Sequence, residues 1–71
     1  REILSEVLSS GERCFYLIHN HPNGIVSPSE EDIKLTVKLS IECQKLDLVL
    51  LDHIIIANEL YFSFKENSIS I

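Results

Sequence analysis

The segment "FYLIHNHPNGIVSPSEED", residues 15–32, decides the fold of this chain, because it joins an apolar strand to the head of a helix. The apolar run beginning at residue 13 predicts a strand covered on both faces, and it leads directly into His19 and His21. The Pro and Gly of "PNG" then predict a turn. The order of strand, turn and helix is typical of an α/β domain.

The helix after this turn is predicted over residues 27–46, "SPSEEDIKLTVKLSIECQKL". Its predicted start is Ser27 as the N-cap, with Pro28 in the first helical position and Glu30 completing an S-x-x-E capping box. This helix is apolar over a wide arc, so we expect further strands or another chain to cover part of it.

The flanking segments complete the predicted order of helix, strand, helix, strand, strand. Residues 1–10 form an amphipathic pattern that Gly11 ends. Residues 46–58 predict a second buried strand and residues 59–66 a third, joined as a hairpin through "NE". We therefore predict one domain over residues 1–71, with a mixed sheet and layers on both sides of it.

The composition excludes several classes of protein. The chain has 71 residues, 45% of them hydrophobic, which is enough for one small core. Its net charge is −5 with six scattered Lys and Arg, so strong nucleic-acid binding is not expected. No apolar run approaches the roughly 20 residues that span a bilayer. Cys14 and Cys43 stand alone without a signal peptide, which predicts two buried thiols of a cytoplasmic protein. Because the chain lacks Met, we expect it to be a piece of a longer protein.

The polar residues of the opening segment predict a metal site. In an extended strand His19 and His21 point to the same side, roughly 7 Å apart. At about 100° per residue, Asp32 falls on the core-facing arc of the helix with Leu35 and Leu39, where a charge needs a partner. The short turn brings this carboxylate back beside the histidines. Two His and one carboxylate, with a water in the fourth position, are the ligands of a catalytic zinc site.

Each of these residues also has a purely structural interpretation. A histidine at a strand end commonly bonds to backbone, and Ser29 with Asp32 is by itself an S-x-x-D capping box. Taken together, H-x-H-x7-S-x-x-D favours the metal site. Asp52 and His53 remain open between orienting a metal ligand and forming a polar pair at the end of a strand.

The sequences "HNHPNG", "SPSEEDI", "LLDHIII" and "YFSF" resemble the carboxy-terminal part of the RadC-like branch of the JAMM (MPN+, JAB domain) zinc metallopeptidases. The resemblance covers nearly the whole chain. It implies a cytidine-deaminase-like α/β/α domain, present here in part, in which His19, His21, Asp32 and a water bind Zn²⁺. It further implies that Ser29 positions the water and stabilises the oxyanion of the tetrahedral intermediate.

The function implied by this resemblance is zinc-dependent hydrolysis of peptide or isopeptide bonds. The family's general-base glutamate lies before the first helix, outside this sequence, so we expect the fragment to carry the metal ligands and to be inactive alone. The alternative is a truncated, non-enzymatic module for protein contact, with a structural metal or none. The branch carries a historical DNA-repair label, which the acidic charge does not support. The substrate is not identified by the sequence.

Overall fold

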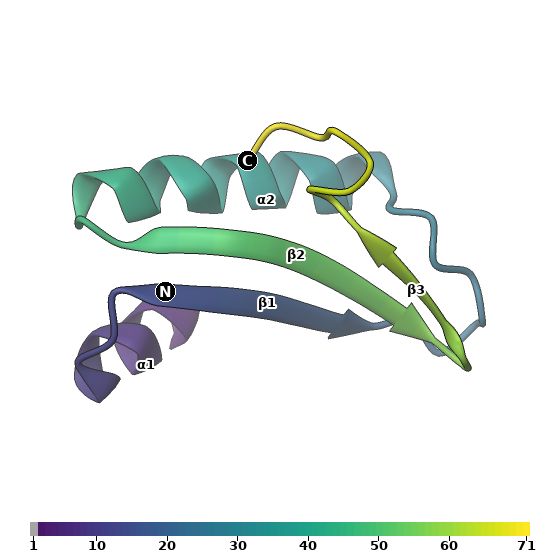
Figure 1. The fold of residues 1–71 in the computed structure, drawn as a ribbon, viewed down its shortest axis with the longest axis horizontal. Helices are drawn as coiled ribbons and strands as arrows, with labels where there is room; N and C mark the ends of the chain where they lie inside the picture. The colour runs from purple at the N-terminus through teal and green to yellow at the C-terminus, as the bar shows by residue number, and fades with distance from the viewer. Residues whose placement is uncertain (1) are drawn as a thin grey trace.

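The fold is a partial α/β domain with a three-stranded mixed sheet (Figure 1). A computed structural model describes residues 2–71. The elements are α1 (Glu2–Ser10), β1 (Cys14–Asn20), α2 (Glu30–Lys45), β2 (Val49–Ala57) and β3 (Leu60–Ser63). Strand β2 lies in the middle, parallel to β1 and antiparallel to β3. The predicted order of elements is confirmed. Neither helix in the described part of the chain has the length and apolar character needed to cross a membrane.

Gly11 and Asn58 have positive φ angles, and each follows the end of a helix or strand at the position that the sequence predicts. Gly11 follows α1 with φ of 79°, a conformation that glycine adopts without a steric penalty. Asn58 has φ of 57° in the two-residue connection between β2 and β3, and asparagine tolerates this region better than most residues. The predicted hairpin is therefore confirmed.

The start of α2 differs from the prediction. The helix begins at Glu30, and its N-cap is Ser29 rather than Ser27. The Oγ of Ser29 accepts a hydrogen bond from the backbone N–H of Asp32, and the Asp32 carboxylate accepts one from the Ser29 N–H. Both bonds have a donor–acceptor distance of 3.0 Å. This second capping box satisfies two helix-end donors at once, which leaves Pro28 outside the helix.

Strands β2 and β3 are shorter than predicted because turns form at their ends. The backbone of Leu46 and Asp47 closes α2, Asp47 with φ of 58°, so β2 starts only at Val49. The chain leaves the sheet after Ser63 and turns back through Phe64, whose N–H donates to the His53 carbonyl over 3.0 Å.

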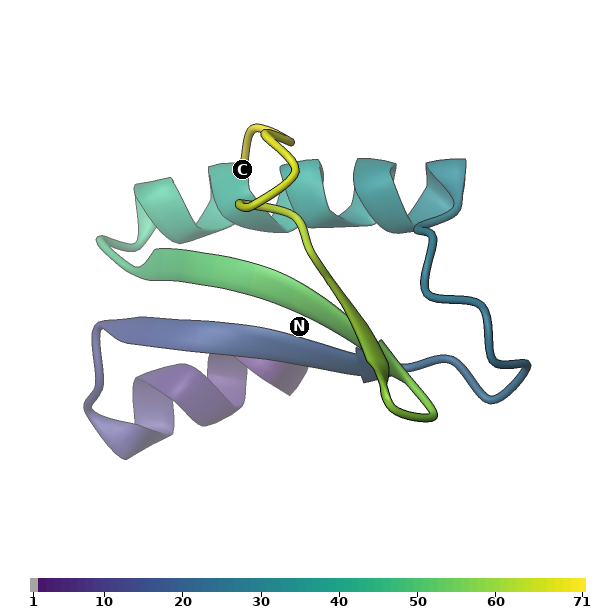
Figure 2. The ribbon, with the colours of Figure 1, turned by 45° about the vertical axis from the view of Figure 1, so that its right-hand side comes forward.

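Both helices contribute to one core on the same face of the sheet. Leu4 of α1 packs with Leu39 and Cys43 of α2 and with Leu50 of β2. Phe15 lies opposite Leu50 in the β1–β2 register and packs against the same cluster. Figure 2 shows α2 running along the sheet from the turn that follows β1. Helix α2 is the crossover connection between the parallel strands β1 and β2, and its first turn lies near the carboxyl end of β1.

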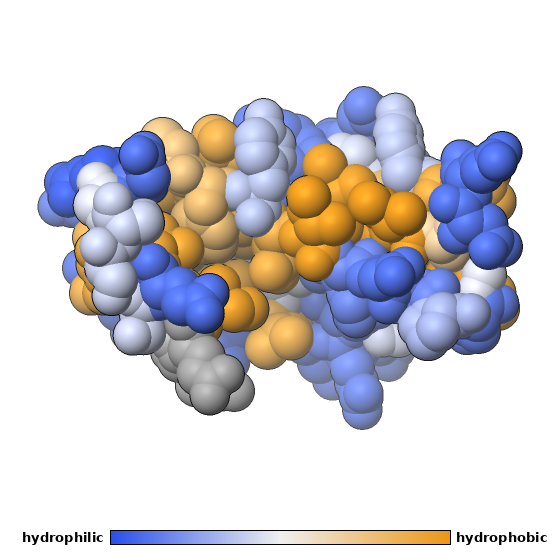
Figure 3. Space-filling model, turned by 90° about the horizontal axis from the view of Figure 1, so that it is seen from below, coloured by the Kyte–Doolittle hydropathy of each residue, from blue (hydrophilic) through white to orange (hydrophobic). Residues whose placement is uncertain are grey.

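The opposite face of the sheet is exposed in the described residues. Tyr16 and Ile18 of β1 are 60% and 62% exposed, and Tyr61 of β3 is 56% exposed. Cys14 lies on this face by strand alternation, so its predicted burial is wrong, whereas Cys43 is buried. Figure 3, seen from the β1 side, shows hydrophobic residues reaching the surface between hydrophilic ones.

The buried carboxylate of Asp52 accepts hydrogen bonds from residues at the end of β3. Asp52 is 8% exposed and accepts hydrogen bonds from the backbone N–H groups of His53 and Lys65 and from the Ser63 hydroxyl. Burial raises the pKa of this carboxyl, but the bonds from Ser63, Lys65 and His53 outweigh it, so the pKa lies below its ordinary value. Asp52 therefore stabilises the fold as the ionised group.

We expect Asp52→Asn to lower the free energy of unfolding at pH 7 by about 1–3 kcal/mol, because a buried charged acceptor is lost. The pKa of Asp52 is lowered by folding, so its contribution is full above the unfolded value, about 3.9, and is lost as pH falls through the folded value. Urea denaturation between pH 7 and pH 3 should show a smaller loss of stability on acidification in the variant than in the wild type.

The matched control is Asp47→Asn, because this side chain is 83% exposed and asparagine tolerates its positive φ. This control should stay within about 0.5 kcal/mol of the wild type. Equal stabilities of Asp52→Asn and the wild type at pH 7 would contradict the assigned role.

Candidate metal centre

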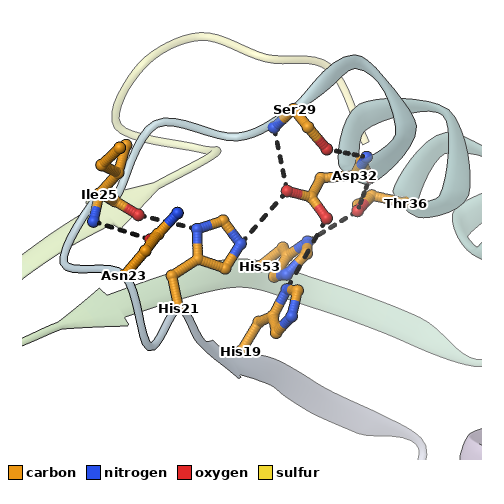
Figure 4. A network of polar contacts seen from close by, with 8 residues as sticks. All are labelled: His19, His21, Asn23, Ile25, Ser29, Asp32, Thr36 and His53. Carbon is orange, nitrogen blue, oxygen red and sulfur yellow. Dashed lines mark hydrogen bonds and ion pairs between the residues drawn. The ribbon is translucent and has the colours of Figure 1, made fainter.

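Three side chains converge where β1 ends and α2 begins (Figure 4). His19 is in β1, His21 follows it by two residues, and Asp32 is in the first turn of α2. One potential ligand atom from each of them lies within 4.8 Å of the others. The structure thus brings together the three residues that the sequence singles out as metal ligands.

The two histidines reach this point from the same side of the strand. Their ring centroids are 4.7 Å apart and the rings meet edge to face, at 83°. The Nδ1 of His19 lies 3.8 Å from Oδ1 of Asp32, and the Nε2 of His21 lies 3.4 Å from Oδ2. Each carboxylate oxygen therefore faces a different imidazole.

The loop after β1 fixes the ring of His21. Its Nδ1 lies 2.8 Å from the carbonyl oxygen of Ile25, which can only accept, so Nδ1 carries the ring proton. The other nitrogen, Nε2, lies toward Asp32 and is the one available to a metal ion. Asn23 supports the loop by accepting from the Ile25 N–H over 3.1 Å. Metal-ligating histidines typically donate a hydrogen bond from their other ring nitrogen to a carbonyl or carboxylate, as Nδ1 of His21 does here.

The capping box fixes Asp32. The hydrogen bond from the Ser29 backbone lowers the pKa of its carboxyl most, burial opposes this, and the Ser29 side chain, His19 and His21 lower it further. The carboxylate is therefore ionised at neutral pH. Ser29, the fourth residue singled out by the sequence, lies beside this carboxylate at the N-cap and is exposed.

The predicted apolar neighbours of Asp32 need one correction. Leu39 is buried as predicted, but Leu35 is 60% exposed, and the next residue, Thr36, faces the core in its place. Thr36 is 0% exposed, and its hydroxyl donates to the Asp32 carbonyl over 2.7 Å. Sequence reasoning missed Thr36, although its position one turn after Asp32 was a usable signal.

His53 of β2 lies next to these residues. It is 2% exposed, and its Nδ1 lies 2.7 Å from the Thr36 hydroxyl oxygen. Burial, followed by the nearby His19, lowers the pKa of His53, with Asp32 and Asp52 opposing. Asp52 accepts from the His53 N–H but directs its remaining bonds to Ser63 and Lys65. Of this pair, left open by the sequence, only the His53 side chain adjoins the cluster.

The donor set suits zinc. Two imidazoles and one carboxylate are the three protein ligands of a catalytic zinc site, which keeps a further position for water. The exposed fractions of the side chains are 46% for His19, 18% for His21 and 15% for Asp32, so solvent can reach the centre from the His19 side. The residues present therefore fit the metal that the family resemblance implies.

Comparison with known proteins identifies the family. The sequence matches the RadC-like JAB domain over residues 1–69. It is 46% identical over 68 residues to a UPF0758 protein of Streptococcus suis, covering 96% of this chain and 28% of the relative. A UPF0758 protein of Trichodesmium erythraeum is 48% identical over 66 residues, covering 93% of this chain and 27% of that protein. One of Clostridioides difficile is 44% identical over 70 residues, covering 97% and 29%. The chain spans less than a third of the length of these relatives, and it belongs to the RadC-like JAB domain family.

Proposed function

We propose that His19, His21 and Asp32 bind one zinc ion and that this centre hydrolyses peptide or isopeptide bonds in the protein that carries the domain. The observation that supports this most is the convergence of three ligand atoms within 4.8 Å. The bond from His21 to the Ile25 carbonyl adds to it, because it directs the free nitrogen of this ring at Asp32.

Zinc in such a centre lowers the pKa of a bound water toward neutrality and polarises the carbonyl of the substrate. The two imidazoles and the carboxylate, at the end of β1 and the start of α2, would hold the ion. His19 has the most exposed side chain of the three, so we place the entry of the substrate on its side.

The Ser29 hydroxyl is available to the substrate. Its oxygen accepts a hydrogen bond from the Asp32 N–H, which leaves its own proton free to donate. A donor next to the metal ligand can stabilise negative charge on the carbonyl oxygen during attack. The general base is assigned to a glutamate outside this sequence, as the family resemblance implies, since the cluster contains only His19, His21 and Asp32 among the described side chains of residues 3–71.

Ser29→Ala is expected to retain zinc and to reduce hydrolysis by about 100-fold in the protein that carries the domain, as the loss of one oxyanion donor does. Loss of the cap should cost about 1 kcal/mol of stability. Zinc content and steady-state rates of the same preparation measure the two effects. Ser27→Ala, in the same loop and exposed, is the control. If Ser29→Ala loses its zinc, the role of Ser29 is confined to holding Asp32.

Hydrolysis itself is tested with the full-length protein in H₂¹⁸O. The zinc-loaded protein is incubated with a library of linear and isopeptide-branched peptides, and the products are examined by mass spectrometry. The proposal expects cleavage with one ¹⁸O in each new carboxylate, and no cleavage with Asp32→Ala or after removal of zinc by a chelator. Cleavage that persists in Asp32→Ala would contradict it.

A further inference from the structure

The geometry points to Thr36 and His53 as a positioning pair of the metal centre, in which Thr36 locks His53 in the Nδ1–H tautomer and the pair ties His19 and Asp32 to β2. The inference rests on the proposed zinc site and extends it, because neither residue belongs to the ligand cluster. Both are buried, with exposed fractions of 0% for Thr36 and 2% for His53, so they act through the ligands.

The tautomer follows from two short contacts of one hydroxyl. The Thr36 oxygen lies 2.7 Å from the Asp32 carbonyl and 2.7 Å from Nδ1 of His53. A carbonyl can only accept, so the single hydroxyl proton points at Asp32. The contact with His53 is then a hydrogen bond only if Nδ1 carries the proton and donates it to Thr36.

The second ring nitrogen agrees with this assignment. Nε2 of His53 is buried and has no hydrogen-bond partner among the described side chains of residues 3–71 or the backbone of residues 2–71. A proton on Nε2 would leave a buried N–H donor unpaired, which folded proteins avoid more strictly than an unpaired acceptor. With the proton on Nδ1, the orphaned atom is a lone pair.

The pair contacts two of the three proposed ligands. The His53 ring stacks on His19, with centroids 6.0 Å apart and an interplanar angle of 20°, and also on Phe64, at 4.5 Å and 17°. Thr36 holds the carbonyl of Asp32, one turn earlier in α2. The orientation of one imidazole and the position of the carboxylate thus depend on the same hydrogen bond between α2 and β2.

The tautomer is tested first in the metal-free wild-type chain. Long-range ¹H–¹⁵N NMR correlations distinguish a protonated from a bare imidazole nitrogen. The inference predicts that His53 carries its proton on Nδ1, whereas histidine in water prefers Nε2. A proton found on Nε2 of His53 would overturn it.

Positioning is tested with Thr36→Val, which keeps the shape and removes the hydroxyl, and with Thr36→Ser, which keeps the hydroxyl. Zinc affinity, measured by competition with a chelator on chains shown to be folded by circular dichroism, should fall about 10-fold or more in Thr36→Val. Thr36→Ser should bind as the wild type does. If Thr36→Val does not fold, His53→Phe, which keeps a stacking ring without nitrogens, should show the same loss.

A folded Thr36→Val that binds zinc as tightly as the wild type would overturn the inference and leave the proposed function intact. A wild-type chain that binds no zinc would overturn the proposed function and the positioning role with it. The NMR result would then still decide the hydrogen bond between Thr36 and His53, so the failures are distinguishable.

Discussion

Asp32→Ala is expected to abolish zinc binding, with a loss of affinity of at least about 100-fold, because two imidazoles alone compete poorly with water for zinc. In the structure Asp32 presents one carboxylate oxygen to each histidine, Oδ1 at 3.8 Å from Nδ1 of His19 and Oδ2 at 3.4 Å from Nε2 of His21. No other acidic side chain in the described part of the chain joins the cluster. Isothermal titration with zinc measures the effect.

Two controls separate ligation from helix capping. Glu31→Ala removes one negative charge from the same turn at an exposed position and should leave the affinity within a few-fold. Asp32→Asn keeps an oxygen that can accept from the Ser29 N–H but lacks the charge that zinc requires. Asp32→Asn should therefore stay folded and lose zinc. If both Asp32 variants keep their zinc, this residue is a helix cap only.

Phe64→Ala is expected to produce the largest loss of stability. The side chain is 0% exposed, stacks on His53 and meets Phe62 edge to face, with centroids 5.9 Å apart. Removing such a ring costs about 3–5 kcal/mol, and a chain of this size has little more than that in total. Circular dichroism during urea denaturation should show the variant largely unfolded at 25 °C.

The control for Phe64→Ala is Leu60→Ala in β3, where the side chain is 59% exposed. That variant should stay within about 1 kcal/mol of the wild type. A Phe64→Ala chain as stable as Leu60→Ala would mean that the ring does not support the sheet as described.

The element order was predictable because the helices show an amphipathic pattern and the strands show apolar runs or alternation between turn residues, but the start of α2 was not predictable. Two capping boxes overlap in the sequence, one from Ser27 to Glu30 and one from Ser29 to Asp32. Each is locally adequate, so propensity does not separate them. In the folded chain the second box also places Asp32 beside the histidines, a contact between segments that local patterns do not encode.

The candidate site was predictable in its ligands and less so in its support. His19 and His21 follow from strand alternation, and Asp32 from the helical wheel. Thr36 was not predicted, because it follows Leu35 directly on the helical wheel and Leu35 was the residue expected to be buried. In the structure Leu35 is exposed and Thr36 is buried. The role of His53 depends on packing across the sheet, which only the three-dimensional structure gives.

The zinc content of the purified chain is the most direct test of the proposed metal site. Elemental analysis of the folded wild-type chain, expressed with zinc and freed of loosely bound metal, is compared with His19→Ala prepared in parallel. We expect about one zinc per chain in the wild type and none in the variant. A folded wild-type chain without zinc, or a His19→Ala chain with as much zinc as the wild type, would contradict it.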